Sequence, residues 1–254
     1  MIYIISPYKT LTNTILASFI FNNQFPNKQL GENMIPEEKD GKYIIRLHTD
    51  YNTIEYINNH DYETEDVTII SVVRDPISQY ISGYFQDISS LPINYGSQEK
   101  VVQSSIYEII DHFNTINFCA IESYNMDTLF RFYDDVFGFC VFDYDNNDYF
   151  TKGYGVYDIK NLHNNNIKII IIRSDKLNNC IQDIGKIFNI NNMTIINSNL
   201  ADEKWYSNIY KTFKKTIINE NKIENINDFM NQQYVRFFYT KEEQNKMYNY
   251  ANFT

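Results

Sequence analysis

The sequence predicts an α/β fold whose central parallel sheet is covered by helices on both faces. Four apolar runs rich in β-branched residues predict buried strands, at residues 2–6, 43–47, 67–73 and 167–172. Their hydrophobicity is continuous rather than alternating, which is typical of parallel strands that are buried on both faces. A helical pattern follows each run, and repeated strand–helix order is characteristic of α/β folds.

The helices that follow the four strands are expected at residues 12–23, 52–59, 76–88 and 174–188. In the third of these, Asp75 is suited to cap the helix and Pro76 fits its first position. The apolar residues of that helix repeat at helical spacing and give it one buried face: Ile77, Tyr80, Ile81, Tyr84 and Ile88.

Further along the chain, residues 101–138 are expected to be mostly helical, and two C-terminal helices are expected at 201–220 and 240–250. The chain contains no internal repeat and no linker long enough to divide it. We therefore expect one domain over residues 1–254.

Charge and cysteine content exclude several classes of protein. The formal net charge is −10, from 22 Lys and Arg against 32 Asp and Glu, which argues against a broad nucleic-acid-binding surface but leaves room for a local basic pocket. The 3 cysteines form no CxxC motif, so unpaired thiols in a reducing compartment are expected.

No apolar run approaches the roughly 18 residues of a membrane span, and the chain does not begin like a signal peptide. A cytoplasmic protein without membrane insertion is expected.

Ligands of open parallel sheets bind beyond the carboxyl ends of the strands, and a loop there connects the first strand to the first helix. Backbone N–H groups and hydroxyls at a helix start, beside a lysine, suit a phosphate-like anion. An ordinary turn with a threonine cap explains the segment equally well, and it is not a Walker loop. The candidate binding residues in this loop are Lys9, Thr10, Thr12, Asn13 and Thr14.

A second candidate lies where the 67–73 strand ends. Arg74 follows this buried strand, and Ser82 lies two helical turns further along. A planar guanidinium and a hydroxyl can bind one phosphate together. The alternative is that Arg74 pairs with a neighbouring acid and that Ser82 is a small packing residue.

A third candidate, His48, follows the 43–47 strand at the same edge of the predicted sheet. A lone histidine is usually structural, but this position favours a general base. The other histidines (His60, His112 and His163) are expected on the surface. No His/Cys/Asp cluster has metal-ligand spacing, so no metal is expected.

Taken together, these segments resemble the PAPS-dependent sulfotransferases. In that family a Pro-Lys-x-Gly-Thr-Thr loop binds the 5′-phosphosulfate of PAPS, and an Arg-Asp/Asn-Pro…Ser-x-Tyr-Phe segment binds its 3′-phosphate. Residues 74–76 (Arg-Asp-Pro) and 82–85 (Ser-Gly-Tyr-Phe) match the second pattern. In the first pattern Lys9 and Thr12 match, whereas Leu11 replaces the usual glycine and Asn13 replaces a hydroxyl residue.

The resemblance extends along most of the chain. Residues 203–207 (Glu-Lys-Trp-Tyr-Ser) are similar to the Asn-Lys-Trp-Tyr-Ser signature of the capsular polysaccharide synthesis family, a sulfotransferase-like group. Residues 137–138, 152–154 and 237–243 are similar to that group as well. The resemblance implies a single-domain, P-loop-like three-layer sandwich.

The resemblance also implies a reaction, the transfer of a sulfuryl group from PAPS to a hydroxyl acceptor by in-line displacement, with PAP as product. His48 would be the general base, and Lys9 would neutralise charge on the leaving group. Thr10, Thr12, Asn13 and Thr14 would bind the 5′-phosphosulfate. The 3′-phosphate would contact Arg74 and Ser82, and the nucleotide would contact Lys204 and Tyr206. The acidic chain favours a neutral glycan or a small hydroxyl compound as acceptor, with no metal and no nucleic acid.

Two other functions stay open. Leu11 and Asn13 depart from the family pattern, which favours a non-catalytic relative that binds a nucleotide or a partner. Lys9, His48, Arg74 and Ser82 are retained, which favours the enzyme. A P-loop-like small-molecule kinase is the third possibility, but the chain lacks the Walker Lys-Ser/Thr pair.

Overall fold

The computed structural model divides the chain into two compact units, and each is described by itself. The first unit combines residues 1–74 with 126–198, and the second combines 75–125 with 199–254. One domain over 1–254 stays a prediction. The residues that the structure describes are 2–7, 12–22, 37–39, 42–47, 66–90, 93–121, 124–160, 166–196, 204–220 and 222–249.

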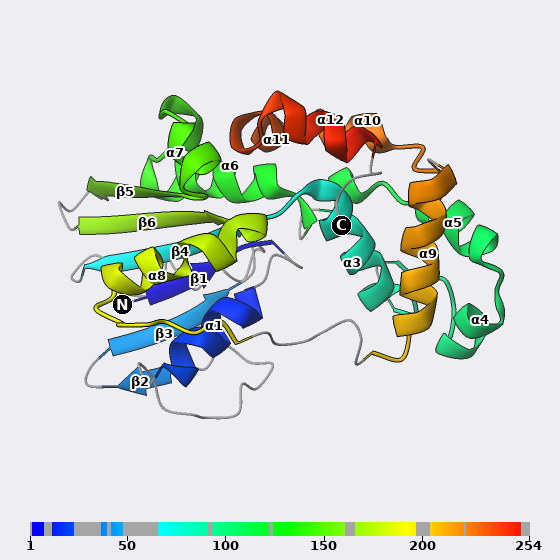
Figure 1. Ribbon diagram of the computed structural model, residues 1–254, viewed down its shortest axis with the longest axis horizontal. Coiled ribbons are helices and arrows are strands. Elements are labelled where there is room, and N and C mark those ends of the chain that lie inside the picture. Colours follow the sequence, from blue (N-terminus) through cyan, green and yellow to red (C-terminus); the bar gives the residue numbers. More distant parts are fainter. Residues whose placement is uncertain are drawn as a thin grey trace. The chain divides into compact units, whose positions relative to one another are not determined.

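The first unit is built on a mostly parallel sheet, which confirms the α/β class (Figure 1). Within the described residues its strand order is β2-β3-β1-β4-β6-β5. The four central strands are mutually parallel, and β2 and β5 pair antiparallel at the two edges. The strands are β1 (Ile2–Ile5), β2 (Glu37–Lys39), β3 (Lys42–Leu47), β4 (Val67–Val73), β5 (Tyr154–Lys160) and β6 (Asn166–Arg173).

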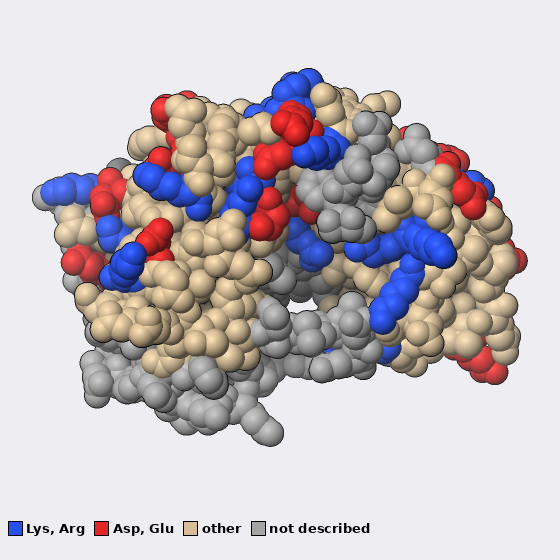
Figure 2. All heavy atoms as spheres, viewed as in Figure 1, with Lys and Arg blue, Asp and Glu red and all other residues tan. Residues whose placement is uncertain are grey.

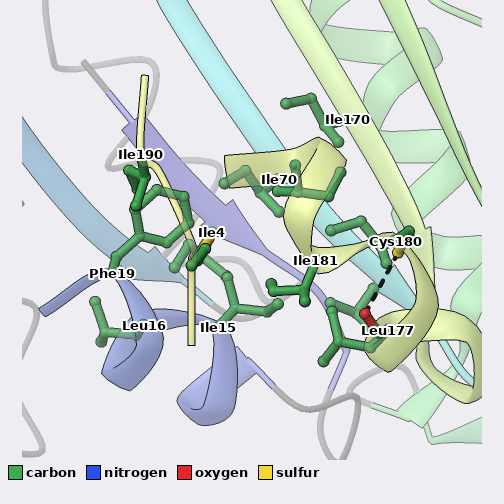
Figure 3. Close-up of a cluster of buried hydrophobic side chains, with 14 residues drawn as sticks. Ile4, Ile15, Leu16, Phe19, Ile70, Ile170, Leu177, Cys180, Ile181 and Ile190 are labelled. Carbon is green, nitrogen blue, oxygen red and sulfur yellow. Dashed lines mark hydrogen bonds between the residues drawn. The ribbon is translucent and has the colours of Figure 1, made fainter. Parts of the chain in front are cut away.

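Helices cover both faces of this sheet. They are α1 (Thr12–Phe21), α6 (Met126–Phe137), α7 (Asn147–Thr151) and α8 (Leu177–Ile187), with short 3-10 turns at Val141–Asp143 (η3) and Ser174–Lys176 (η4). On one face, α1 and α8 bury their apolar side chains against β1, β4 and β6, as Figure 3 shows for Ile4, Phe19 and Ile181. On the other face, Tyr133 of α6 hydrogen-bonds the Ser71 side chain of β4. The continuous apolar runs of the sequence are therefore explained by burial from both sides.

Two expectations differ from the structure. β5 was not expected, because its sequence Tyr-Gly-Val-Tyr-Asp-Ile-Lys alternates and contains Asp158 and Lys160, both exposed at the edge of the sheet. Such alternation is typical of an edge strand with one solvated face, so a search for continuous apolar runs overlooks it. α8 begins at Leu177, after the η4 turn, and not at residue 174. The helix expected at 52–59 lies outside the described residues.

The second unit is helical in its described part. It contains α3 (Pro76–Asp87), α4 (Gln98–Gln103), α5 (Ile106–Thr115), η1 (Phe118–Ala120), α9 (Ser207–Glu220), α10 (Ile226–Met230), α11 (Gln233–Phe238) and α12 (Lys241–Asn249). The predicted start of α3 is confirmed, since Pro76 is its first residue and Asp75 Oδ1 accepts the Ser78 N–H at 2.7 Å.

Aromatic rings form the core of this unit around α3. The Phe85 ring centroid lies 5.0 Å from that of Phe213 and 5.3 Å from that of Tyr210, while the Tyr84 centroid lies 5.2 Å from that of Phe113. Most of these pairs meet edge to face, which is the favoured geometry of aromatic contacts. The predicted apolar face of α3 is confirmed, because Ile77, Tyr80, Ile81, Tyr84 and Ile88 are all 0% exposed.

His112 is half-buried and contacts two tyrosines. Its Nδ1 lies 2.9 Å from the Tyr84 hydroxyl, and its ring meets that of Tyr95 edge to face. Burial, with a smaller contribution from Lys100, lowers the pKa of His112. Burial also raises the pKa of Tyr84, so the pair is neutral at pH 7.

Gly83 occupies the middle of α3 because the Tyr124 ring packs directly on it. A Cβ added at Gly83 would lie 2.2 Å from the Cε1 atom of Tyr124. The Tyr124 hydroxyl donates to the carboxylate of Asp87, one turn further along α3, and its backbone oxygen accepts from Gln79 Nε2 at 2.9 Å. These bonds at both ends of the residue hold the ring in place.

We predict that Gly83→Ala lowers the free energy of unfolding by about 1–3 kcal/mol, the usual cost of overpacking a core. On an exposed helix the same change would stabilise by about 0.5–1 kcal/mol, so the sign of the effect reports the contact with Tyr124. Urea denaturation measures it, and Gln86→Ala, at an exposed position of α3, is the matched control. A stabilised Gly83→Ala protein would contradict this packing.

Candidate functional site

Three of the predicted site segments follow strands whose carboxyl ends lie side by side in the sheet. β3, β1 and β4 are parallel neighbours, paired as Ile5 with Leu47 and as Ile4 with Ile70, so their carboxyl ends coincide. The loop after β1 begins at Ser6, and Arg74 follows β4 directly. The sequence prediction that these strands share one edge is confirmed.

The strand order reverses between β1 and β4. From β1 the chain passes through α1 and later joins the sheet as β3, on one side of β1. From β4 it next joins the parallel strands as β6, on the opposite side. Loops that leave two neighbouring strands in opposite directions open a crevice, and open α/β sheets bind their ligands at this topological switch point.

Two buried serines hold β1 and β4 together at this point. Ser6 and Ser71 are both 0% exposed. The Ser6 Oγ accepts the Val72 N–H at 2.7 Å, and the Ser71 hydroxyl donates to the Ile5 carbonyl oxygen. The two side chains thus continue the pairing of β1 and β4 beyond Ile4 and Ile70, and they fix the position from which the β1–α1 loop departs.

Tyr133 completes this arrangement from α6. Because the single hydroxyl proton of Ser71 goes to Ile5, the Tyr133 hydroxyl is the donor in the bond between Tyr133 and Ser71. Tyr133 is 0% exposed, and burial raises its pKa, so it keeps this proton at neutral pH. The sequence did not point to Ser6, Ser71 or Tyr133. Their hydrogen-bond partners are more than 60 positions away, and no local pattern identifies such partners.

The beginning of α1 suits an anion. The first turn of α1 contains no acidic residue, and the unpaired N–H groups of a helix start attract negative charge. Asn13 is half-buried and Thr14 is buried there. Thr12 is the first residue of α1, but its side chain lies outside the described residues, as do Lys9, Thr10 and Leu11.

Arg74 is the candidate cation at the end of β4, the strand beside β1 at the switch point. It is half-buried, directly after the last residue of β4. The neighbouring carboxylate of Asp75 caps α3 through its bond to the Ser78 N–H. His48, the first residue after β3, lies outside the described residues, so its role as a base stays a prediction.

The other predicted residues belong to the second unit. Ser82 is half-buried on α3. Tyr206 is 7% exposed, and its ring packs 5.7 Å from that of Phe85, between centroids. Burial raises the pKa of Tyr206 to about 12, with smaller contributions from Tyr210 and Asp87. Tyr206 is therefore a core residue of this unit, while Lys204 beside it is half-buried.

Arg173 was not singled out from the sequence, although it repeats the pattern of Arg74 by following an isoleucine-rich strand. It ends β6 and pairs in register with Val73 of β4. Its side chain is 1% exposed and forks onto Asp175, with Nε 3.1 Å from Oδ1 and Nη2 2.7 Å from Oδ2. The partly exposed carboxylate of Asp175 neutralises the buried guanidinium, so we regard this bidentate pair as a structural feature.

The described residues give no sign of metal or disulfide chemistry. In the part of the chain that the structure describes, no group of three His, Cys, Asp or Glu residues could hold a metal ion. Cys119, Cys140 and Cys180 are not in a disulfide in the part of the chain that the structure describes, and burial raises the pKa of Cys180 to about 11. No helix among the described residues is long and apolar enough to cross a membrane.

The chain matches no protein-family model, no curated protein and no solved structure. The function is therefore inferred from the geometry of the switch point and from the motif residues.

We predict that Ser6→Ala lowers the free energy of unfolding by about 1–3 kcal/mol, because the Val72 N–H loses its acceptor at a position with no solvent exposure. Chemical denaturation measures the change. Ser90→Ala is the matched control, since Ser90 is exposed and its hydroxyl bond to Asp87 is 3.4 Å long; it should shift stability by less than about 0.5 kcal/mol. Equal effects of the two substitutions would contradict the role given to Ser6.

Proposed function

We propose that the chain is a sulfotransferase that moves the sulfuryl group of PAPS to a hydroxyl of a carbohydrate, and that its first unit is a P-loop-like sandwich. One observation carries this proposal. The loop that resembles the phosphosulfate-binding loop and the arginine that resembles the 3′-phosphate ligand follow adjacent strands, at the point where the strand order reverses.

The described residues at this edge fit a nucleotide with two phosphate groups. The α1 start, without an acid in its first turn, and the guanidinium of Arg74 both favour anions. They leave the sheet from neighbouring strands, so each can take one phosphate of the same nucleotide. In a chain of net charge −10, such a concentration of donors at one edge is the feature that an anionic nucleotide requires.

The chemistry assigned to the chain follows from these positions. PAPS supplies an activated sulfuryl group, so the protein needs to deprotonate the acceptor and to stabilise the leaving phosphate. In this proposal His48 takes the proton of the acceptor hydroxyl, and Lys9 neutralises negative charge on the bridging oxygen. Arg74 orients the nucleotide through its 3′-phosphate. The resemblance assigns further nucleotide contacts to Ser82, Lys204 and Tyr206, and each can be tested by its own substitution.

We predict that adenosine 3′,5′-bisphosphate raises the melting temperature of the wild-type chain. At about 100 times its Kd a ligand stabilises by about 2.7 kcal/mol, which corresponds to roughly 5–10 °C for a chain of this size. ATP should act only weakly. Arg74→Gln should remove most of the shift, whereas Arg131→Gln, at an exposed position of α6, should keep it. No shift with the bisphosphate at millimolar concentration would contradict the nucleotide assignment.

We predict that His48→Ala lowers the transfer of labelled sulfate from PAPS by about 10²–10⁴-fold, the usual contribution of a general base. The variant should keep the bisphosphate-induced thermal shift, because His48 acts on the acceptor. His163→Ala is the control and should keep full activity. Unchanged turnover in His48→Ala would remove His48 from this role.

Transfer by the wild-type chain is measured across a panel of glycans, peptides and phenols. Bisphosphate binding without any transfer would favour a non-catalytic relative. Leu11 and Asn13, which differ from the loop pattern of the family, favour the same alternative.

A further inference from the structure

β5 ends the strand order of the sheet in the described residues, so it forms one edge of the first unit (Figure 1). It has 7 residues and contains no proline, whereas β2 at the opposite edge has 3 residues. Its register with β6 is continuous, without a bulge. Proteins usually protect the edges of their sheets with short strands, prolines, bulges or a covering element, because an open edge pairs readily with another strand. β5 is thus long and regular enough to accept a further strand.

The ladder between β5 and β6 determines which backbone groups face this edge. The Arg173 N–H donates to the Gly153 carbonyl oxygen at 2.8 Å, one position before the opposed pair of Tyr154 and Ile172. Hydrogen-bonded and non-hydrogen-bonded pairs alternate along antiparallel strands, so every second residue of β5 directs its N–H and C=O groups away from β6. These outward-facing residues are Tyr154, Val156, Asp158 and Lys160.

The side chains of this edge are exposed, while the strand is supported from one face. Val156 is 38% exposed, although valine is among the residue types most often buried. Asp158 and Lys160 are exposed as well. On the other face of β5, the Tyr149 hydroxyl of α7 lies 2.7 Å from that of Tyr157. α7 therefore packs on a face of β5 and holds the strand in place for pairing at its edge.

Charges of both signs alternate along this edge. Asp158 forms an ion pair with Lys168, which lies directly opposite it on β6. Lys160 follows two positions later, on the same face of the strand. At the left end of β5 and β6 in the view, Figure 2 shows basic and acidic side chains side by side. A strand that carries the same two charges in reverse order would complement the edge, and an antiparallel copy of β5 has this order.

We propose that β5 pairs antiparallel with β5 of a second copy of this chain, so that two sheets join across a twofold axis. In the register centred on Ile159, Asp158 lies opposite the partner's Lys160, and the symmetry repeats this pair. A register centred on Asp158 would place two like charges opposite each other, which is destabilising. One centred on Tyr157 would place Asp158 opposite the partner's Val156. The charges therefore select the register centred on Ile159.

In this register Asp158 lies between two lysines, Lys168 of its own β6 and the partner's Lys160. The outward N–H and C=O groups of Asp158 and Lys160 face those of the partner, so the pairing adds backbone hydrogen bonds as well. Both copies use the same edge, so the contact closes at two chains. A contact of one strand per chain is small, and we expect the dimer to dissociate at micromolar concentrations.

This pairing is independent of the proposed function. β6 lies between β5 and β4, so a strand added at β5 leaves the switch point between β1 and β4 open. The nucleotide site and the dimer contact can therefore be tested separately on the same protein.

The test is sedimentation velocity of the full chain over a range of concentrations. Lys160→Glu should weaken the dimer about tenfold, because two attractive pairs become pairs of like charge. Asp158→Lys should weaken it for the same reason. An equimolar mixture of these two variants should form a heterodimer, since both cross-chain pairs are then attractive. The matched control is Lys215→Glu, the same change of charge at an exposed position of α9, which should dimerise like the wild type.

Cross-linking tests the register. Ile159→Cys places two thiols opposite each other at the twofold axis, in a non-hydrogen-bonded pair with Cα atoms about 4.5 Å apart, which suits a disulfide. Oxidised glutathione should convert this variant to a covalent dimer on a non-reducing gel. Val156→Cys is the control, because its two copies lie about 20 Å apart in this register. It should give no more covalent dimer than the wild-type chain.

A wild-type dimer that Lys160→Glu weakens, and that the mixture of oppositely charged variants restores, supports the proposal. A wild-type chain that stays monomeric at millimolar concentration overturns it and leaves β5 to an extended segment of another protein. Equal effects of Lys160→Glu and Lys215→Glu, a mixture that stays monomeric, or cross-linking through Val156→Cys in place of Ile159→Cys also overturn it. The melting temperature of each variant is measured to verify folding, and the bisphosphate thermal shift should be the same in Lys160→Glu as in the wild type.

Discussion

The junction between β1 and β4 is the constraint on which the proposed site depends. Backbone pairing ends at Ile4 and Ile70, and beyond it the side chains of Ser6 and Ser71 continue the contact between the two strands. Tyr133 fixes Ser71 from the helix layer beneath. The loop after β1 and Arg74 after β4 thus begin at defined positions on adjacent strands, where the strand order reverses and open α/β sheets bind their ligands. Rigid strand ends of this kind are a suitable base for groups that bind an anionic nucleotide.

Much of this edge could be predicted from the sequence. The isoleucine- and valine-rich runs identified all four parallel strands, and Asp75 with Pro76 located the start of α3. The predictions depended on local signals, namely burial on both faces and helix capping. β5 was overlooked because an edge strand alternates, and Arg173 was overlooked because its neutralisation by Asp175 depends on the backbone turn between them. Tyr84 and His112 are 28 positions apart, and no local pattern links them.

The motif residues divide into two physical classes. Gly83, Tyr84 and Phe85 are required by packing, since Tyr124 covers the glycine and the two rings enter an aromatic core. Tyr206 belongs to the same class. Arg74 and the start of α1 differ, because they lie at the carboxyl ends of β4 and β1 and not in the aromatic core. A cation and a helix start on adjacent strand ends, in a chain of net charge −10, are the physical reason to propose an anionic ligand there.

The central claim is that a bisphosphate nucleotide binds at the carboxyl edge, between β1 and β4. A crystal structure of the chain grown with adenosine 3′,5′-bisphosphate tests it most directly. We expect one phosphate within hydrogen-bond distance of the Arg74 guanidinium and the other against the first turn of α1. Density for the nucleotide elsewhere, such as beside β6 and Arg173, would contradict the account.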